Sequence, residues 1–290
     1  MNINGKTTVF GIIGDPIEHT MSPFIHNIIS RAVGIDAVYV PFRANGDMVN
    51  ITKGLYALGV KGINVTVPYK TKIIPQLYMV EEVAQRIGAV NTLKYTEEGY
   101  KGYNTDILGL DRELIKEGIS LDNRNVVILG AGGAARAVAF MCAGKAVSSI
   151  TIVNRTLAKA ESIKESLVEY LIAKGNFSLG EKIYVMTAEE LKQRGEGGYV
   201  AFQCTNVGLS PKVDECVICD EAFYEKVEIG IDLIYKPART RFMKYVEEAG
   251  GRAFNGLRML IYQAVCSYEI WNDIKVPDEV VGLIEEKMLK

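Results

Sequence analysis

A lysine follows a short β-branched segment that is interrupted by proline. Residues 64–70 read N-V-T-V-P-Y-K, and the β-branched residues favour a strand. Pro68 has no backbone N–H for a sheet ladder, so it predicts the end of that strand. Lys70 then stands just past the carboxyl end of the strand, where it is either a solvated surface charge or a group placed to move a proton.

Two further polar side chains stand close to predicted element ends. Asn91 lies in G-A-V-N-T-L, inside a predicted hairpin, and Asp106 follows Asn104 in Y-N-T-D-I-L-G, where a helix begins. A carboxylate at a helix start can serve chemistry or simply cap the helix. The segment alone does not decide between these roles for Asp106.

Two hydroxyl groups precede another predicted helix, in G-D-P-I-E-H-T-M-S-P-F-I-H at residues 14–26. Ser22 followed by Pro23 fits an N-cap and the first helical position, so capping alone would explain Ser22. Thr20 and Ser22 beside a helix N-terminus would also suit a carboxylate ligand. The two histidines, His19 and His26, are given no catalytic role, because a lone histidine is more often packed or solvated.

A glycine-rich turn follows a buried strand in V-V-I-L-G-A-G-G-A-A-R-A. Gly130, Gly132 and Ala135 fit the G-x-G-x-x-G/A pattern of dinucleotide sites. The first glycine permits a tight turn, the second lets a pyrophosphate approach the backbone, and the small third residue lets helix and strand pack closely. The strand–turn–helix context favours a dinucleotide site over a merely structural turn, because the helix N-terminus offers free N–H groups to an anion.

The next strand, S-S-I-T-I-V, ends at Asn154, Arg155 and Thr156, with Lys159 one helical turn further on. An NAD site usually carries an acid at this place for the ribose 2′-hydroxyl. The chain has no acid there, and a guanidinium suits a 2′-phosphate. The pattern therefore favours NADP over NAD, the alternative being that Arg155 only ends the strand in solvent.

The elements that position these residues alternate between strand and helix, which predicts an α/β fold with mostly parallel sheets. The predicted elements are strands near 8–13, 37–42, 62–67 and 125–129, helices near 23–33, 47–58 and 80–87, a hairpin ending at Y-K-G-Y, a helix starting near Asp106, and closing helices near 256–273 and 278–289. The second α/β run extends to about residue 253. The last two helices have no following strand, so they must pack elsewhere in the molecule.

Composition limits the classes of function. The 290 residues suit two domains, and 48% hydrophobic with 23% charged residues is typical of a soluble globular protein. The formal net charge of −2 gives no reason to expect nucleic acid or an anionic membrane as partner. No apolar stretch is long enough to span a bilayer, and the first residues lack the apolar core of a signal peptide. Five scattered cysteines, including one C-V-I-C at 216–219, indicate reduced cytosolic thiols rather than a zinc site.

Taken together, these segments resemble the shikimate dehydrogenase family, NADP-dependent oxidoreductases that interconvert 3-dehydroshikimate and shikimate in the pathway to chorismate and the aromatic amino acids. The resemblance covers essentially the whole chain and also rests on G-I-N-V-T-V-P-Y-K, N-R-T, D-L-I-Y-K-P-A-R-T and G-L-R-M-L-I-Y-Q-A. It implies two α/β domains around a cleft, the second a Rossmann-type doubly wound parallel sheet. Residues 1–106 and 256–290 would bind substrate, and residues 107–255 would bind NADP.

The resemblance also implies roles for individual residues. Lys70 and Asp106 match the family's catalytic pair. The positions that match its substrate-binding residues are Thr20, Ser22, Thr66, Asn91, Tyr235 and Gln263. The positions that match its cofactor site are Gly130, Ala131, Gly132, Gly133, Ala134, Asn154, Arg155, Thr156 and Lys159. No metal site is expected.

The chain departs from the family pattern at two places. Thr20 stands where the family usually has serine, and its extra methyl group bears on the choice between shikimate and the bulkier quinate. Residues 203–209 read Q-C-T-N-V-G-L where N-A-T-S-x-G-M is more usual, in a loop that lies near the nicotinamide in the family. Gln203 and Asn206 therefore leave the details of the cofactor side open, and residues 210–222 have no interpretation.

Three alternatives remain beside a cytoplasmic shikimate dehydrogenase that acts on a small molecule as a monomer or homodimer. One is a quinate/shikimate dehydrogenase, with dual substrate use or NAD as cofactor. Another is a non-catalytic ligand-binding sensor, although such a protein could dispense with Lys70 or Asp106 and both are present. The last is an RNA-associated reductase, which the near-neutral charge disfavours.

Overall fold

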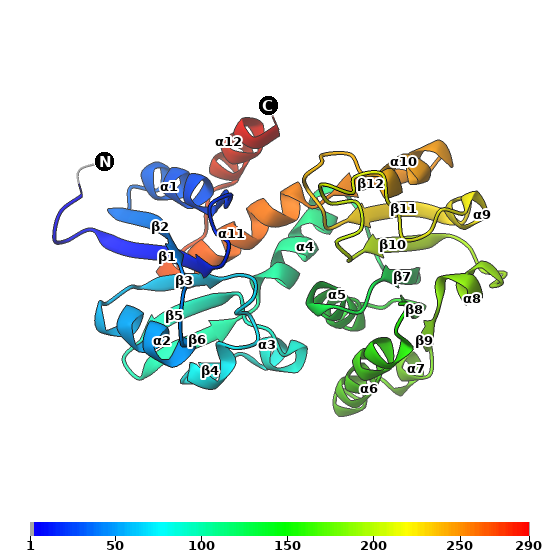
Figure 1. Ribbon diagram of the computed structural model, residues 1–290, viewed down its shortest axis with the longest axis horizontal. Helices are drawn as coiled ribbons and strands as arrows, with labels where there is room; N and C mark the ends of the chain where they lie inside the picture. The colour runs from blue at the N-terminus through cyan, green and yellow to red at the C-terminus, as the bar shows by residue number, and fades with distance from the viewer. Residues whose placement is uncertain (1–2, 290) are drawn as a thin grey trace. The chain divides into compact units, whose positions relative to one another are not determined.

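The computed structural model describes residues 3–289 of the chain, which form two compact units (Figure 1). The first unit comprises residues 1–113 and 258–290, and the second comprises residues 114–257. The sequence interpretation placed these boundaries at 106/107 and 255/256, and residues 1, 2 and 290 lie outside the described part. The boundaries differ because each falls within or next to a continuous helix, α4 (Thr105–Lys116) and α11 (Leu257–Asn272), rather than in a linker.

The first unit contains a mixed six-stranded sheet with the strand order β2-β1-β3-β5-β6-β4. Its strands are β1 (Thr8–Gly14), β2 (Ala37–Arg43), β3 (Gly62–Val65), β4 (Met79–Val80), β5 (Thr92–Thr96) and β6 (Gly99–Tyr103). The first three strands run parallel, whereas β5 is antiparallel to both of its neighbours. The hairpin that the sequence predicts is thus confirmed as β5–β6.

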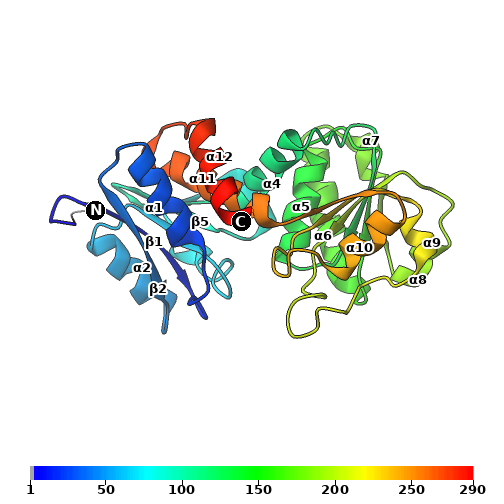
Figure 2. The same ribbon diagram turned by 90° about the horizontal axis from the view of Figure 1, so that it is seen from above.

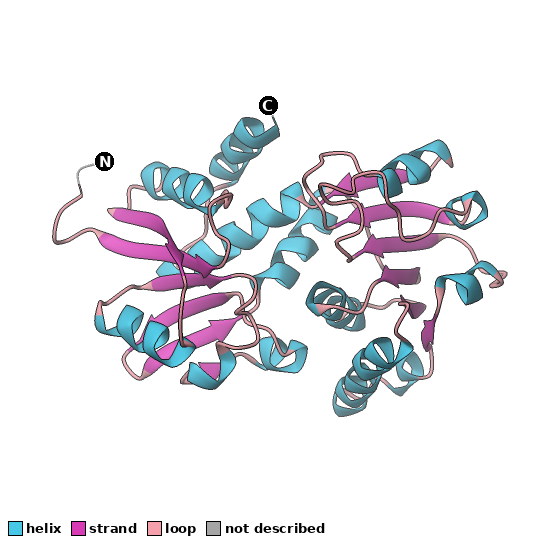
Figure 3. Cartoon of the chain, in the orientation of Figure 1, coloured by secondary structure: helices cyan, strands magenta, loops and turns pink. Residues whose placement is uncertain are grey.

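Helices cover both faces of this sheet (Figure 3). They are α1 (Ser22–Ala32), α2 (Met48–Ala57), the short η1 (Ile74–Gln76), α3 (Glu82–Ile87), α4, α11 and α12 (Asp278–Leu289). Side chains alternate along β1, so Ile13 packs with Met48 and Leu55 of α2, whereas Phe10 stacks on Trp271 of α11 at 4.9 Å. The C-terminal helices α11 and α12 therefore belong to the first unit, as Figure 2 also shows for α12 beside α1.

The strand before Lys70 is shorter than the sequence predicts. β3 ends at Val65, so Pro68 does not terminate it, and the prediction of a strand over 62–67 is wrong in its last two residues. The predicted helix over 80–87 likewise begins only at Glu82, because Val80 pairs in the short strand β4. Both errors lie at element ends, where local signals are weakest.

The second unit is a parallel six-stranded sheet with the order β12-β11-β10-β7-β8-β9. Its strands are β7 (Asn125–Leu129), β8 (Ser149–Val153), β9 (Ile183–Met186), β10 (Tyr199–Gln203), β11 (Val227–Asp232) and β12 (Arg252–Asn255). The strand order reverses between β7 and β10, which is the arrangement of a doubly wound Rossmann-type sheet. The predicted α/β class and the predicted Rossmann-type second sheet are thus confirmed.

Six helices follow these strands within the second unit. They are α5 (Gly133–Ala143), α6 (Leu157–Ala173), α7 (Phe177–Gly180), α8 (Ala188–Lys192), α9 (Glu221–Tyr224) and α10 (Arg241–Glu248). One core combines Val127 and Ala201 of the sheet with Phe223 of α9 and Phe242 of α10. Within residues 3–289, no helix has both the length and the apolar character that a membrane crossing requires.

Candidate active site

Polar segments of the first unit converge where three of its strands end. The pairings of Ile13 with Val65 and of Asn64 with Thr92 place the carboxyl ends of β1 and β3 at the edge where β5 begins. β6 runs back to the same edge, because Tyr103 pairs with Thr92. The segments after β1, β3 and β6 therefore present their side chains along one edge of the sheet.

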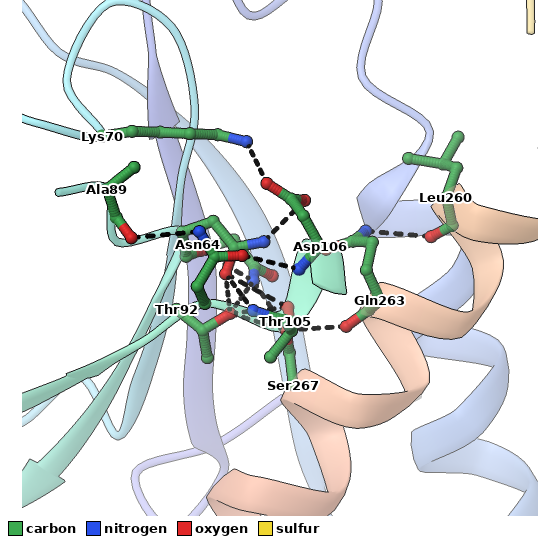
Figure 4. A network of polar contacts seen from close by, with 11 residues as sticks. Asn64, Lys70, Ala89, Thr92, Thr105, Asp106, Leu260, Gln263 and Ser267 are labelled. Carbon is green, nitrogen blue, oxygen red and sulfur yellow. Dashed lines mark hydrogen bonds and ion pairs between the residues drawn. The ribbon is translucent and has the colours of Figure 1, made fainter. Parts of the chain in front are cut away.

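Lys70 and Asp106 form an ion pair at this edge (Figure 4). Lys70 Nζ donates to Asp106 Oδ2 at 2.7 Å, and the two side chains are 31% and 21% exposed. The other carboxylate oxygen, Oδ1, accepts from Asn91 Nδ2 at 2.8 Å. The ammonium group is thus oriented by a carboxylate that is itself held from the other side, while both side chains keep access to solvent.

The side-chain amide of Asn91 has one orientation that its neighbours permit. Its Oδ1 accepts from the Thr105 backbone N–H at 2.7 Å and from the hydroxyls of Thr92 and Thr105 at 2.9 and 3.2 Å. Because a backbone N–H can only donate, this oxygen must face Thr105, and Nδ2 must face Asp106. Asn91 therefore donates a hydrogen bond to the carboxylate of Asp106, which favours the ionised form of that group.

A buried polar cluster that sequence reasoning missed supports these residues. It consists of Asn64, Thr92, Thr105 and Ser267, which are all at most 5% exposed. Asn64 Nδ2 donates to Thr92 Oγ1 at 3.0 Å and to Ser267 Oγ at 2.9 Å, and the Thr105 and Ser267 hydroxyls lie 3.0 Å apart. Two signals were present in the sequence, the single polar residue in the apolar strand G-I-N-V and the N-T pair that recurs at 91–92 and 104–105.

Asp106 does not cap α4, in whose first turn it lies. The N–H of Asp106 donates to Asn104 Oδ1 at 3.1 Å, so Asn104 supplies the cap one residue before α4. The amide of Asn104 is anchored in turn, because its Nδ2 donates to the Ala89 carbonyl at 3.0 Å. The capping explanation for Asp106 is therefore wrong, and its carboxylate remains available to Lys70 and Asn91.

Thr20 and Ser22 lie together at the start of α1. Thr20 Oγ1 donates to Ser22 Oγ at 3.2 Å, and the Ser22 N–H donates to Thr20 Oγ1 at 3.3 Å. The prediction that Ser22 is the N-cap is wrong, because the cap position falls on Met21 and no side chain caps the helix. The two hydroxyls thus lie within hydrogen-bonding distance of each other at the start of α1, where a carboxylate could bind both of them.

Thr66 and Gln263 occupy two further positions near this edge. The Thr66 N–H donates to the Ile13 carbonyl at 3.0 Å, which places Thr66 beside the end of β1. Gln263 lies on α11 and donates from Nε2 to the Leu260 carbonyl at 2.9 Å, as Figure 4 shows. Tyr235 belongs to the second unit, where its side chain is 37% exposed, and its part in substrate binding stays a prediction.

Neither histidine takes part in this constellation. His26 is completely buried and stacks on Tyr39 with ring centroids 4.2 Å apart, and burial lowers the pKa of His26 to about 3. It is therefore a neutral core residue. His19 is exposed and precedes Thr20.

The glycine turn of the second unit is open to an anion. Gly130 has a φ of +116°, which favours glycine, and a Cβ there would lie 2.9 Å from Thr205 Cγ2. No atom lies within 4 Å of a Cβ built on Gly132 or Gly133, where α5 begins. Ala135 is completely buried in that helix. The turn, which also contains Ala131 and Ala134, thus has the free N–H groups and the room that a pyrophosphate needs.

A cationic segment follows the neighbouring strand β8. Asn154 holds the turn, since its N–H donates to the Met186 carbonyl and its Nδ2 to the Thr156 carbonyl, at 3.1 and 2.9 Å. Arg155, Thr156 and Lys159 are exposed, and within residues 3–289 neither Arg155 nor Lys159 forms an ion pair. Two cations without an acidic partner beside the glycine turn suit a 2′-phosphate.

Comparisons with known proteins agree with this arrangement. Three family models match the chain: shikimate dehydrogenase substrate binding domain over residues 12–93, shikimate/quinate 5-dehydrogenase over 113–184, and shikimate 5′-dehydrogenase C-terminal domain over 256–281. A curated relative from Methanothermobacter thermautotrophicus, named shikimate dehydrogenase (NADP(+)), is 38% identical over 96% of each chain.

Solved structures show the same likeness. A crystal structure of a shikimate dehydrogenase in complex with NADP⁺ is 35% identical, covers 100% of this chain and 98% of its own, and has a TM-score of 0.89. A shikimate 5-dehydrogenase from Listeria monocytogenes in complex with shikimate and NAD is 30% identical, with 98% of each chain covered and a TM-score of 0.87. The likeness therefore extends over both units.

Proposed function

Because the chain belongs to the shikimate dehydrogenase family, we propose that it catalyses the reversible NADPH-dependent reduction of 3-dehydroshikimate to shikimate. The observation that carries the proposal is the ion pair of Lys70 and Asp106, held by Asn91 at the edge of the first sheet. The proposed reaction is that of an oxidoreductase acting on a CH–OH group, and it belongs to the pathway to chorismate and the aromatic amino acids.

Reduction of a ketone adds a hydride to the carbonyl carbon and a proton to the oxygen, and bound NADPH would supply the hydride. Lys70 Nζ donates the proton, because it is the cation of the pair and retains N–H groups beyond the one that binds Asp106. Asp106 keeps the ammonium in place through the 2.7 Å contact. A positioned acid of this kind typically contributes about 10²–10⁴-fold to the rate.

Substrate orientation follows from the groups around this pair. Thr20 and Ser22 bind the carboxylate with their hydroxyls and the α1 N-terminus. Asn91, Asp106 and Gln263 bind the ring hydroxyls, and Thr66 is a further substrate-binding residue of the same unit. Gln263 can do so once its amide exchanges the Leu260 carbonyl for substrate.

The cofactor residues in this proposal all lie in the second unit. The pyrophosphate binds the backbone of Gly130, Ala131, Gly132, Gly133 and Ala134. Arg155 and Lys159 contact the 2′-phosphate, and Asn154 and Thr156 shape the turn that presents them. The free guanidinium of Arg155 is what favours NADP over NAD.

The deciding experiment is steady-state oxidation of shikimate and of quinate, each with NADP⁺ and with NAD⁺. We expect kcat/KM for shikimate with NADP⁺ to exceed the other three values by more than tenfold, or about 1.4 kcal/mol in transition-state binding. Comparable values with quinate or NAD⁺ would assign the chain to the dual-specificity alternative, for which Thr20 is the residue to examine. Binding of shikimate with no oxidation would indicate a sensor.

We also propose that the protein is cytoplasmic and acts on its small-molecule substrate as a monomer or homodimer, without a nucleic-acid or membrane partner. Size-exclusion chromatography with light scattering distinguishes the 32.0 kDa monomer from a dimer.

A further inference from the structure

The side chain of Gln203 folds the loop that follows β10. It is 1% exposed, and its Oε1 accepts from the N–H and the hydroxyl of Thr205 at 2.6 and 2.7 Å. Its Nε2 donates to the carbonyls of Val207 and Thr205 at 3.0 and 3.3 Å. One side-chain amide therefore bonds the backbone of loop 204–207 at both Thr205 and Val207.

Asp232, at the end of the neighbouring strand β11, supports this amide from behind. It is completely buried, and its Oδ1 lies 3.5 Å from Gln203 Nε2 and accepts from the Ile234 N–H at 2.9 Å. Its Oδ2 accepts from the Thr240 hydroxyl at 2.6 Å. Since these donors occupy the carboxylate on several sides, Gln203 has little freedom to rotate.

The loop lies against the glycine turn. Gln203 pairs with Leu129 across β10 and β7, and the Cys204 N–H donates to the Leu129 carbonyl at 2.9 Å. The methyl group of Thr205 would lie 2.9 Å from a Cβ on Gly130. The strand order reverses between β7 and β10, so the glycine turn and loop 204–207 lie on opposite sides of the reversal point. A doubly wound sheet binds dinucleotides across that point.

The two halves of the sheet then face different halves of the dinucleotide. The β7–β9 half carries the glycine turn and Arg155, which are the groups for the pyrophosphate and the adenosine 2′-phosphate. The β10–β12 half, with loop 204–207, is left for the nicotinamide nucleotide. Asn206 is the exposed residue of this loop, and in the described part of the chain its side-chain amide has no hydrogen-bond partner.

We propose that Gln203 is a positioning residue, which holds loop 204–207 against Gly130 so that Asn206 contacts the nicotinamide half of the cofactor. The inference rests on the proposed function, because it takes NADP as the ligand. The proposal explains why a glutamine is present at position 203, because its side chain is long enough to bond both the Thr205 N–H and the Val207 carbonyl.

The test measures Kd for NADP⁺ and for 2′,5′-ADP, which lacks the nicotinamide half, by calorimetry with the full chain. In Gln203→Leu the side chain has similar size but no hydrogen bonds, so loop 204–207 is released. We expect Kd for NADP⁺ to rise tenfold or more, or about 1.4 kcal/mol, while Kd for 2′,5′-ADP changes less than twofold. Amide exchange at Thr205 and Val207 should become faster.

Two further variants keep the test decisive. Thr187→Ala removes the capping box of α8 in the same unit without touching the loop, so it should lower the stability of the protein and leave both Kd values unchanged. Asn206→Ala removes only the exposed contact and does not depend on a refolded loop. It should weaken NADP⁺ by about threefold or more, the value of one neutral hydrogen bond, and leave 2′,5′-ADP unaffected.

The inference is overturned if either Gln203→Leu or Asn206→Ala keeps the wild-type affinity for NADP⁺, or if either variant weakens 2′,5′-ADP as much as NADP⁺. Either result with intact shikimate oxidation by the wild-type chain would leave the proposed function standing. A wild-type chain that binds neither ligand would instead overturn the cofactor assignment, and this inference with it.

Discussion

Lys70 and Lys72 stand two residues apart and differ in their surroundings. Lys70 is partly buried against Asp106, whereas Lys72 is exposed, with its Nζ 6.0 Å from the centre of the Tyr69 ring. The two residues carry the same charge on the same segment. A difference between their alanine variants therefore reports the role of the position rather than the loss of a cation.

We expect Lys70→Ala to lower kcat for shikimate oxidation by about 10²-fold or more, the typical value of a general acid or base, with little change in KM. Lys72→Ala should keep wild-type kinetics. Steady-state assays with saturating NADP⁺ measure both variants. Near-normal turnover in Lys70→Ala would remove Lys70 from proton transfer.

Arg155 should decide between the two nicotinamide cofactors. Its exposed guanidinium has no acidic partner in the described residues, so we expect it to form charge-assisted hydrogen bonds with a 2′-phosphate. Arg155→Ala should then raise KM for NADP⁺ by tenfold or more, given about 1.5–3 kcal/mol for such bonds, and leave KM for NAD⁺ nearly unchanged. NAD⁺ is the internal control, and an equal loss for both cofactors would contradict the assignment.

Helices α4 and α11 meet at Gly109, three residues after Asp106. A Cβ on Gly109 would lie 2.6 Å from the backbone nitrogen of Gln263 and 2.8 Å from the Met259 carbonyl. Backbone atoms cannot move aside as a flexible side chain can. Gly109 therefore sets the distance between the helix that carries Asp106 and the helix that carries Gln263.

We expect Gly109→Ala to destabilise the protein by about 1–3 kcal/mol through overpacking, although alanine favours a helix by about 1 kcal/mol. It should also raise KM for shikimate, because Gln263 is displaced relative to Asp106. Gly282→Ala in α12 is the matched control, since nothing lies within 4 Å of its added Cβ, and it should stabilise. Urea unfolding and KM for shikimate distinguish the two variants. Equal stabilities would show that α4 and α11 can move apart at little cost in free energy.

Element types could be predicted from the sequence, but their partners could not. Hydrophobic periodicity and the glycine turn predict the order of strands and helices and the Rossmann-type sheet. They do not predict that Asn64 bonds Ser267, 203 residues away, because a polar residue in an apolar strand shows that a hydrogen-bond partner is needed but not which residue supplies it. The cap at Ser22 failed for a local reason: Met21 has φ −89° and ψ −7°, which is helical rather than extended, so the Ser22 hydroxyl turns to Thr20 instead.

At the scale of the whole molecule, the buried carboxyl group of Asp232 bears on how stability depends on pH. Within the described residues it accepts hydrogen bonds and forms no ion pair with a cation. Burial raises the pKa of Asp232 from 3.8 to about 6, against the hydrogen bonds from Thr240 and Ile234. Below pH 3.8 both the folded and the unfolded chain hold this proton. Between that pH and about 6 the unfolded chain loses the proton first, so stability falls as pH rises; above about 6 the cost is constant.

The two pKa values correspond to a loss of about 2 kcal/mol of unfolding free energy between pH 4 and pH 7 from this one group. Asp232→Asn should remove this pH dependence of the unfolding free energy. The difference in unfolding free energy between wild type and variant should therefore change by the same amount between pH 4 and pH 7. Urea unfolding followed by circular dichroism at pH 4, 5.5 and 7 measures the difference. An amide cannot accept all three hydrogen bonds, but that cost does not depend on pH, whereas the ionisation of a carboxylate does. A difference that is constant with pH would therefore mean that Asp232 is solvated when it ionises.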